Sequence, residues 1–151
     1  AGGNKNDAEK LLGTIKTDLS INFIGKLKPK LILTYLKNTR LTIIPSLDEP
    51  FGIFLAEALC CGSPIVVTNV GGIPEVIFLA KMNLSNQQKQ IFDSFVQVVP
   101  PDINSISKSI KFFIENSKES DDFMKLVPII RKNFEWKLIL GNLNKLIKEN
   151  I

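Results

Sequence analysis

The chain contains no histidine among its 151 residues, and its only two cysteines, Cys60 and Cys61, are adjacent. The absence of histidine excludes Ser-His and Cys-His nucleophilic catalysis within this chain. Neighbours on a helix point about 100° apart, so the two thiols do not form an ordinary disulfide. Without histidine or a second cysteine pair we expect no zinc site. We therefore predict no bound metal and interpret both cysteines as packing residues in a reducing compartment.

The sequence also lacks long apolar runs and dense charge runs. No apolar run approaches the ~20 residues that a membrane helix needs, and the first residues contain no apolar signal-peptide core. The net charge of +4 comes mainly from lysines scattered along the chain. Such a spread is typical of a solvated surface, so we expect no nucleic-acid partner. Without a predicted membrane helix or signal-peptide core, we expect a cytoplasmic location. Association with a membrane surface through lysines of the last helices stays open, but the pattern does not indicate it.

What the chain has is the composition of a globular domain. Hydrophobic residues make up 44% and charged residues 23% of the sequence, which is enough apolar material to bury a core. We predict a single domain over residues 1–151, in which residues 102–151 form the closing helices.

Helical and strand-like segments alternate along the first two thirds of the sequence. This rhythm predicts an α/β fold with a Rossmann-like parallel sheet and helices on both faces. The segment 81–95, rich in Asn, Gln and Lys, fits either an inserted helix or a surface loop. We expect strands at 20–24, 41–44, 65–68 and 96–99, and helices at 7–17, 29–38, 52–61, 73–82, 85–95, 103–116, 120–133 and 134–149.

Two carboxylates flank the expected start of the 52–61 helix. Glu49 lies in the preceding loop and Glu57 one turn into the helix. Free N–H groups of residues 51–54 favour a phosphate oxygen there, and carboxylates accept hydrogen bonds from sugar hydroxyls. Taken singly, Glu49 could cap the first turn and Glu57 could complement the helix dipole. Together they indicate a site for a polyol that carries phosphate.

The surrounding residues carry a longer and more specific pattern. Residues 45–58 read Pro-Ser-x-x-Glu-Pro-Phe-Gly-x-x-x-x-Glu-Ala, and residues 62–76 read Gly-x-Pro-Ile-Val-Val-Thr-x-x-Gly-Gly-Ile-Pro-Glu-Val. This string resembles the C-terminal, donor-binding domain of retaining GT-B glycosyltransferases of the glycogen synthase, sucrose synthase and mannosyltransferase type (glycosyl transferases group 1). The Phe-Glu-Trp at 134–136 is similar to the signature of that family's closing helix.

The resemblance implies a set of residue roles. Glu49 would hold hydroxyls of the donor sugar at the catalytic centre, and Glu57 would bind the ribose hydroxyls. Gly71 and Gly72 would be structural, giving the second loop room beside the cleft. The donor would be a UDP-, ADP- or GDP-sugar with no further cofactor, and its hexose would pass to a sugar or lipid-linked acceptor. The backbone of Phe51, Gly52 and Ile53 would hold the sugar's far edge and the diphosphate, and Lys26 and Leu27 would lie against the base.

The same resemblance predicts that the chain is an N-terminally truncated piece. The phosphate-neutralising arginine and lysine of the family and its N-terminal acceptor domain have no counterpart here, and we expect the isolated chain to be inactive. Two alternatives stay open: a non-catalytic nucleotide-sugar-binding or scaffold subunit with the same fold, and a sugar-nucleotide epimerase. A phosphorylase is disfavoured because no lysine for pyridoxal phosphate lies within residues 46–76.

Overall fold

The computed structural model describes residues 20–116 and 121–135, and the expected helix at 7–17 and most of that at 134–149 lie outside them. Most of the expected elements are confirmed to within one or two residues. In chain order the elements are α2 (Pro29–Asn38), β1 (Thr42–Ile44), α3 (Ile53–Cys61), β2 (Ile65–Thr68), α4 (Ile73–Lys81), α5 (Asn86–Phe95), β3 (Val96–Val99), α6 (Ile103–Glu115), α7 (Asp121–Met124) and α8 (Val127–Asn133).

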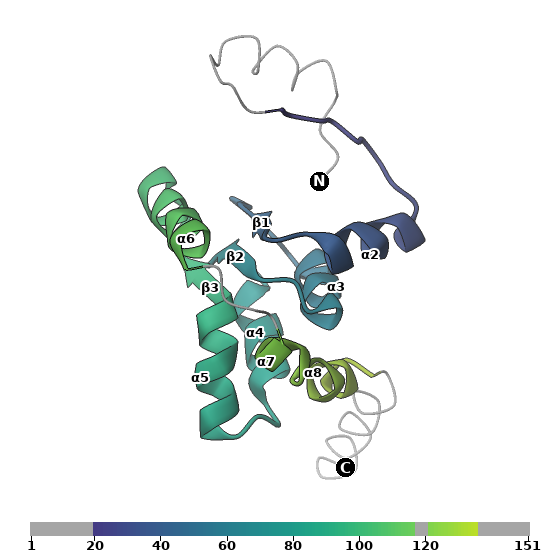
Figure 1. Cartoon of the computed structure of the whole chain (residues 1–151), viewed down its shortest axis with the longest axis vertical. Helices are drawn as coiled ribbons and strands as arrows, with labels where there is room; N and C mark the ends of the chain where they lie inside the picture. Colours follow the sequence, from purple (N-terminus) through teal and green to yellow (C-terminus); the bar gives the residue numbers. More distant parts are fainter. Residues whose placement is uncertain (1–19, 117–120, 136–151) are drawn as a thin grey trace, which may run out of the picture.

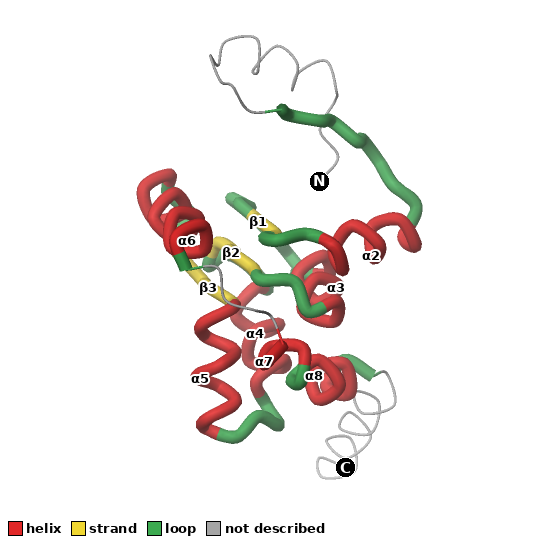
Figure 2. Tube along the Cα trace, viewed as in Figure 1, coloured by secondary structure: helices red, strands yellow, loops and turns green. Residues whose placement is uncertain are grey.

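The three strands form one parallel sheet in the order β1-β2-β3. The central strand β2 is buried along its whole length, as expected for a strand with a β-branched, mostly apolar sequence that is covered on both faces. Figure 1 shows α6 on one side of this sheet and α3 and α4 on the other, and Figure 2 shows the short strands between these helices. The predicted α/β arrangement with helices on both faces is therefore confirmed.

Side-chain alternation along β2 divides its residues between the two layers. Ile65 and Val67 belong to the main core cluster, to which α3, α4 and α8 contribute, whereas Val66 is buried outside that cluster. Because successive residues of a strand point to opposite faces, Val66 lies on the side of α6. In that helix Ser109 is buried.

Helix α8 satisfies carbonyl groups at the ends of two neighbouring helices. The Arg131 Nε donates to the Cys60 carbonyl of α3 at 2.8 Å. The fully buried Asn133 donates its Nδ2 to the Ala80 carbonyl of α4 at 3.2 Å, and its Oδ1 accepts from Asn83 at 2.5 Å. The last carbonyls of a helix have no partner within the helix, so these contacts fix α8 against the layer that carries α3.

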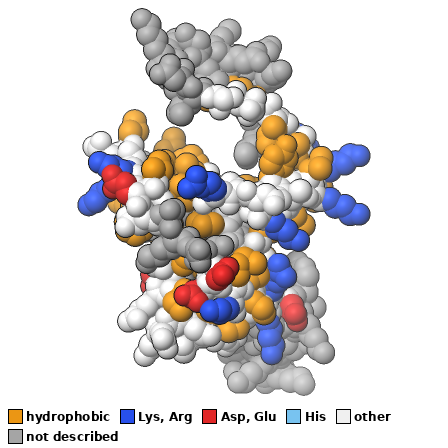
Figure 3. Space-filling view, viewed as in Figure 1, with side chains coloured by type: hydrophobic (Ala, Val, Ile, Leu, Met, Phe, Trp, Pro, Cys, Tyr) orange, Lys and Arg blue, Asp and Glu red, His pale blue; other side chains and the backbone are white. Residues whose placement is uncertain are grey.

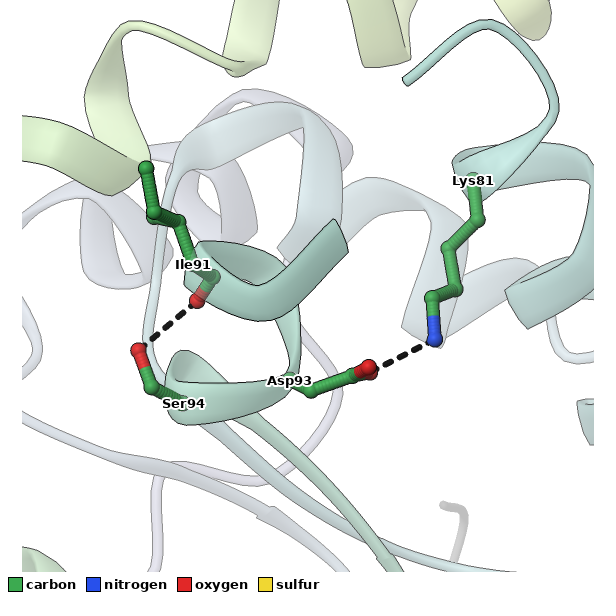
Figure 4. A network of polar contacts seen from close by, with 4 residues as sticks. All are labelled: Lys81, Ile91, Asp93 and Ser94. Carbon is green, nitrogen blue, oxygen red and sulfur yellow. Dashed lines mark hydrogen bonds and ion pairs between the residues drawn. The ribbon is translucent and has the colours of Figure 1, made fainter. Parts of the chain in front are cut away.

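The segment 81–95, for which the sequence left two alternatives, is mostly helix. Ser85 accepts from the Gln88 N–H at 3.3 Å while the Gln88 side chain accepts from the Ser85 N–H at 2.9 Å, which is a capping box at the start of α5. The Lys81 Nζ at the end of α4 lies 2.6 Å from Asp93 of α5, and the Ser94 hydroxyl donates to the Ile91 carbonyl (Figure 4). These contacts hold α5 in place beside β3.

Two expectations were wrong. Residues 20–24 form no strand, and Ile21, Phe23 and Ile24 are exposed. This segment runs apart from the described sheet (Figure 1), and alternating residues form a strand only where a neighbouring strand accepts their hydrogen bonds. The expected helix at 120–133 is two helices, because Pro128 lacks an N–H and occupies the first turn of α8.

Candidate functional site

The loops that follow β1 and β2 lie against each other at the carboxyl edge of the sheet. The Thr68 hydroxyl at the end of β2 donates to the Ser46 carbonyl at 2.6 Å. The Gly72 N–H donates to the Glu49 carbonyl at 2.7 Å. Side-chain and backbone contacts thus join the two loops into a single platform, in the place where ligands bind in open parallel sheets.

The approach of the two loops depends on Gly71 and Gly72. A Cβ on Gly72 would lie 2.5 Å from the Pro50 carbonyl oxygen, and one on Gly71 would overlap the Glu49 carbonyl oxygen. Gly71 also has a φ of +51°, which L residues with a side chain rarely adopt. The structural role expected for both glycines fits this close contact.

The Glu49 side chain is oriented by the loop that carries it. Its half-buried carboxylate accepts a hydrogen bond from the Gly52 N–H at 3.0 Å. This bond engages the N–H of the N-cap residue and none of the first-turn N–H groups of α3, so the first-turn cap that the sequence left as an alternative for Glu49 is not formed. The Gly52 N–H, which we expected to be free for a phosphate oxygen, is occupied in this structure. A carboxylate has about four acceptor sites, so the bond to Gly52 leaves Glu49 able to accept from a hydroxyl.

The first turn of α3 has no side-chain cap. The N-cap residue is Gly52, with a φ of +65°, and it has no side chain that could accept a hydrogen bond from the helix. The bond from the Ala56 N–H to the Gly52 carbonyl, 3.1 Å long, closes the first turn. The N–H groups of Ile53 and Phe54 consequently point out of the helix start, where anions are favoured. Phe51 and Ile53 are exposed beside them.

Glu57 is separated from the helix start. It lies in the second turn of α3, which has no acidic residue in its first turn. The helix dipole acts mainly within the first turn, so a purely dipolar role does not account for this half-buried carboxylate. Phe54 lies three residues earlier and Cys61 four residues later, on the same face of the helix. The Cys61 Sγ lies 4.0 Å from the Leu33 carbonyl, so this face of α3 is turned toward α2.

Between α2 and α3 lies a pocket of about 490 Å³. It contains Lys26 and Leu27, the two residues expected beside a base, and it reaches Phe54, one turn before Glu57. Gly25 has a φ of +61° and open space around it, so its backbone conformation, rather than crowding, favours glycine there. Sequence patterns did not identify the aromatic rings of this pocket, because Tyr35 and Phe54 read as ordinary apolar helix positions. The lining residues are Ile24, Gly25, Lys26, Leu27, Ile32, Tyr35, Leu36 and Phe54.

A second groove, of about 520 Å³, lies beside the platform. Glu75, in the first turn of α4, is its only acidic lining residue. The sequence left Glu75 as an exposed helix-start carboxylate, and its place in this groove was not predicted. The groove is lined by Pro50, Phe51, Gly71, Gly72, Glu75, Val76 and Leu79.

The described residues contain two thiols, both in α3. Burial raises the pKa of the Cys60 and Cys61 thiols, which keeps them protonated and unreactive and fits the packing role expected of them. Residues 20–116 and 121–135 contain no group of three side chains able to hold a metal ion. Within the same ranges no helix is long and apolar enough to cross a bilayer. Lysine and arginine side chains are spread over the face shown in Figure 3, in agreement with their scatter in the sequence.

Comparison with known proteins shows the family to which this chain belongs. The family model Glycosyl transferases group 1 matches residues 1–126. An uncharacterized glycosyltransferase of Methanocaldococcus jannaschii is 40% identical over 55 residues, covering 36% of this chain and 14% of that protein. The D-inositol 3-phosphate glycosyltransferase of Corynebacterium jeikeium is 29% identical over 85 residues, covering 56% and 20%.

A glycogen synthase of Mycobacterium tuberculosis is 33% identical over 63 residues, covering 42% of this chain and 15% of that protein. The sucrose-phosphate synthase of Thermosynechococcus elongatus has a similar structure, with a TM-score of 0.62 and 21% identity over 85% of this chain and 29% of its own. That similarity confirms the GT-B type of fold. The chain thus spans a small part of the length of these relatives.

Proposed function

Because the chain belongs to the Glycosyl transferases group 1 family, we propose that it is the donor-binding domain of a retaining glycosyltransferase. The donor is a nucleotide-diphosphate hexose, and the acceptor is a sugar or a lipid-linked group. The rest of the enzyme, including the domain that binds the acceptor, belongs to sequence outside these residues.

The observation that carries the proposal is the two-loop platform at the carboxyl edge of the sheet. The bonds from Thr68 to Ser46 and from Gly72 to Glu49 hold the β1 loop in one shape. That shape sets an oriented carboxylate beside an uncapped helix start. Glycosyl transfer needs both features in one place, since the sugar presents hydroxyls and the leaving group is a diphosphate.

Roles can be assigned along the platform in the order of the donor's own parts. The Phe51–Ile53 backbone and the first N–H groups of α3 lie at the diphosphate and the far edge of the sugar. Glu49 accepts from sugar hydroxyls through the lone pairs that Gly52 leaves free. Glu57 accepts from the ribose diol, and the pocket beside Lys26 and Leu27 takes the base.

Turnover requires more than this half of the cleft. The acceptor has to be held in line with the anomeric carbon, and positive charge has to stabilise the leaving diphosphate. We propose that these parts come from the remainder of the enzyme, so the 151-residue chain binds donor without transferring its sugar. Detectable transfer to acceptor by the purified chain would contradict this division of labour.

Calorimetric titration separates the assigned roles. The chain is titrated with nucleoside diphosphates and with their hexose conjugates, and binding is expected at about 1 mM or tighter. Glu49→Gln should weaken only the hexose conjugates, because the sugar hydroxyls lose a charged acceptor. Glu57→Gln should weaken conjugates and plain diphosphates alike, because both contain the ribose. Failure of every nucleotide to bind at several millimolar would refute the proposed function.

A further inference from the structure

A further pocket, of about 330 Å³, lies between β3 and α6. Gln97 and Val99 reach it from β3, and they pair in register with Val66 and Thr68 of β2. Because paired residues point to the same face of a sheet, the pocket lies on the side of α6, opposite α3 and α4. It is thereby separate from the donor platform. Helix α6 contributes Ser105, Lys108, Ser109 and Phe112.

Ser109 places a free hydroxyl at a buried position of this pocket. The residue is only 6% exposed, and its hydroxyl forms no hydrogen bond with any described residue. A serine or threonine inside a helix often donates to the carbonyl four residues earlier, as Thr34 does to Lys30 at 3.0 Å. No fully buried side-chain oxygen or nitrogen among the described residues lacks a partner. The Ser109 hydroxyl therefore opens into the pocket, where it can donate and accept.

The groups around Ser109 add positive charge and a second donor and acceptor. Within residues 20–116 and 121–135 no carboxylate forms an ion pair with Lys108, whereas Lys111 in the next turn lies 3.6 Å from Glu115. The Gln97 side chain, from the neighbouring strand, forms no hydrogen bond with the described residues either. An ammonium only donates hydrogen bonds, while an amide and a hydroxyl both donate and accept. A ligand in this pocket consequently meets one cation beside two groups of mixed character.

We propose that this pocket binds a monosaccharide that carries one anionic group, either a phosphate or a carboxylate. Lys108 pairs with the anionic group, and Ser109 and Gln97 exchange hydrogen bonds with the ring hydroxyls. Phe112, which is 36% exposed, packs against a C–H face of the ring. The inference does not rest on the proposed function, because none of these residues belongs to the donor platform.

The lining favours a charged sugar over other small ligands. Sugar hydroxyls donate and accept, as Gln97 and Ser109 do. An apolar ligand would leave these two groups without partners, which costs free energy. A free phosphate ion would pair with Lys108 but would gain nothing from the apolar surfaces of Val99 and Phe112. The volume lies at the lower end of the roughly 300–1,000 Å³ typical of small-molecule sites, which suits a single ring.

The test compares four ligands in calorimetric titrations of the 151-residue chain. Glucose 6-phosphate and glucuronate carry both the ring and the charge, glucose has only the ring, and inorganic phosphate has only the charge. We expect at least one of the two charged sugars to bind with a Kd of about 1 mM. Glucose and phosphate should each bind about tenfold more weakly or not at all. The tighter of the two charged sugars identifies the anionic group.

Matched variants locate the binding. Lys108→Met should weaken the charged sugar by about tenfold and Ser109→Ala by about fivefold. Lys111→Met and Ser107→Ala, which change the same residue types of α6 outside the pocket, should leave the affinity as it is. Glu49→Gln should also have no effect, because the donor platform is not involved. Circular dichroism should show the same unfolding midpoint for Lys108→Met as for the wild type.

Each contrary result overturns a defined part of the inference. If neither charged sugar binds at about 10 mM, the site does not exist. Equal binding of inorganic phosphate and glucose 6-phosphate would refute the part of the sugar ring. Equal losses in Lys108→Met and Lys111→Met would show general attraction to the basic surface, and a loss in Glu49→Gln would place the ligand at the donor platform. Unchanged affinity in Ser109→Ala would remove the buried hydroxyl from the site.

Discussion

Helices α5 and α6 begin differently from helix α3, although all three start in loops at the surface. Ser85 forms a capping box at the start of α5, and Asp102 accepts from the Ser105 N–H at the start of α6 at 2.9 Å. At α3 the N-cap residue is Gly52, which has no side chain to offer. The shape of that start is maintained instead by contacts with the loop after β2.

The difference separates helix starts that serve the fold from one that is suited to a ligand. A capping side chain satisfies first-turn N–H groups and thereby removes them as anion donors. An uncapped start keeps these donors, but it needs external support to hold its shape. Gly71 and Gly72 supply that support by letting a second backbone approach. From this comparison we expect substitutions in the loop contact that supports α3 to have large effects on stability. Substitutions of the caps of α5 and α6 should change stability and leave nucleotide binding unchanged.

The largest effect is expected at Gly71. Gly71→Ala should lower the free energy of unfolding by about 3 kcal/mol, because the added Cβ would overlap the Glu49 carbonyl and strain the positive φ. Urea unfolding followed by circular dichroism measures this change. Gly25→Ala is the matched control, since its φ is similarly positive but its surroundings are open. It should cost about 1 kcal/mol, and equal losses in both variants would show that loop contact contributes nothing.

The next effect concerns affinity rather than stability. Glu57→Gln should weaken binding of a nucleotide sugar by about tenfold, because two charge-assisted hydrogen bonds from the ribose are replaced by weaker ones. The unfolding midpoint should stay the same. Glu115→Gln, at an exposed helix position in α6, is the matched control and should leave binding unchanged. Equal affinity of Glu57→Gln and the wild type would remove Glu57 from the site.

A purely structural cap should behave in the opposite way. Ser85→Ala should destabilise the chain by about 1 kcal/mol, because both hydrogen bonds of the capping box are lost. Its affinity for nucleotides should not change. Ser107→Ala, within α6 and exposed, should have little effect on stability. A loss of nucleotide affinity in Ser85→Ala would contradict the separation between the two kinds of helix start.

The smallest effect is a pH dependence at the start of α6. Hydrogen bonding to the Ser105 side chain, and next to the Ser105 N–H, lowers the pKa of Asp102 below its ordinary value of 3.8. The stabilisation from this carboxylate is therefore fully present above that ordinary pKa and is lost as the pH falls through the lower, folded-state pKa. The stability difference between the wild type and Asp102→Asn should shrink over that acidic range. Unfolding curves from pH 5 downward test this, and a constant difference would exclude the linkage.

Much of the fold could be predicted because its elements carry their own signals. The β-branched residues of β2 indicated a buried strand, and Gly62, with its φ of +77°, ends α3 where the sequence predicted a helix end. The strand predicted at residues 20–24 was wrong because an alternating pattern does not show whether a neighbouring strand is present. The single helix predicted at 120–133 was wrong because Pro128 lies at the start of a new helix and does not continue the previous one.

The candidate site was predictable in outline and not in detail. Glu49 and Glu57 were identified from their spacing and from the family pattern around them. The engagement of the Gly52 N–H by Glu49, the groove beside Glu75 and the rings of Tyr35 and Phe54 were not. Each of these depends on residues brought together from different parts of the chain, which no local pattern records.

The sequence by itself determined the family, the order of helices and strands, and the presence of two glutamates around one helix start, because these follow from local periodicity and from an unbroken motif. Only the tertiary structure decided what that helix start can do. Gly71 and Gly72 approach Glu49 and Pro50 from another loop, and Thr68 fixes Ser46. Such backbone contacts depend on the packing of β1 beside β2, so the open helix start of α3 is a property of the folded sheet edge rather than of the motif alone.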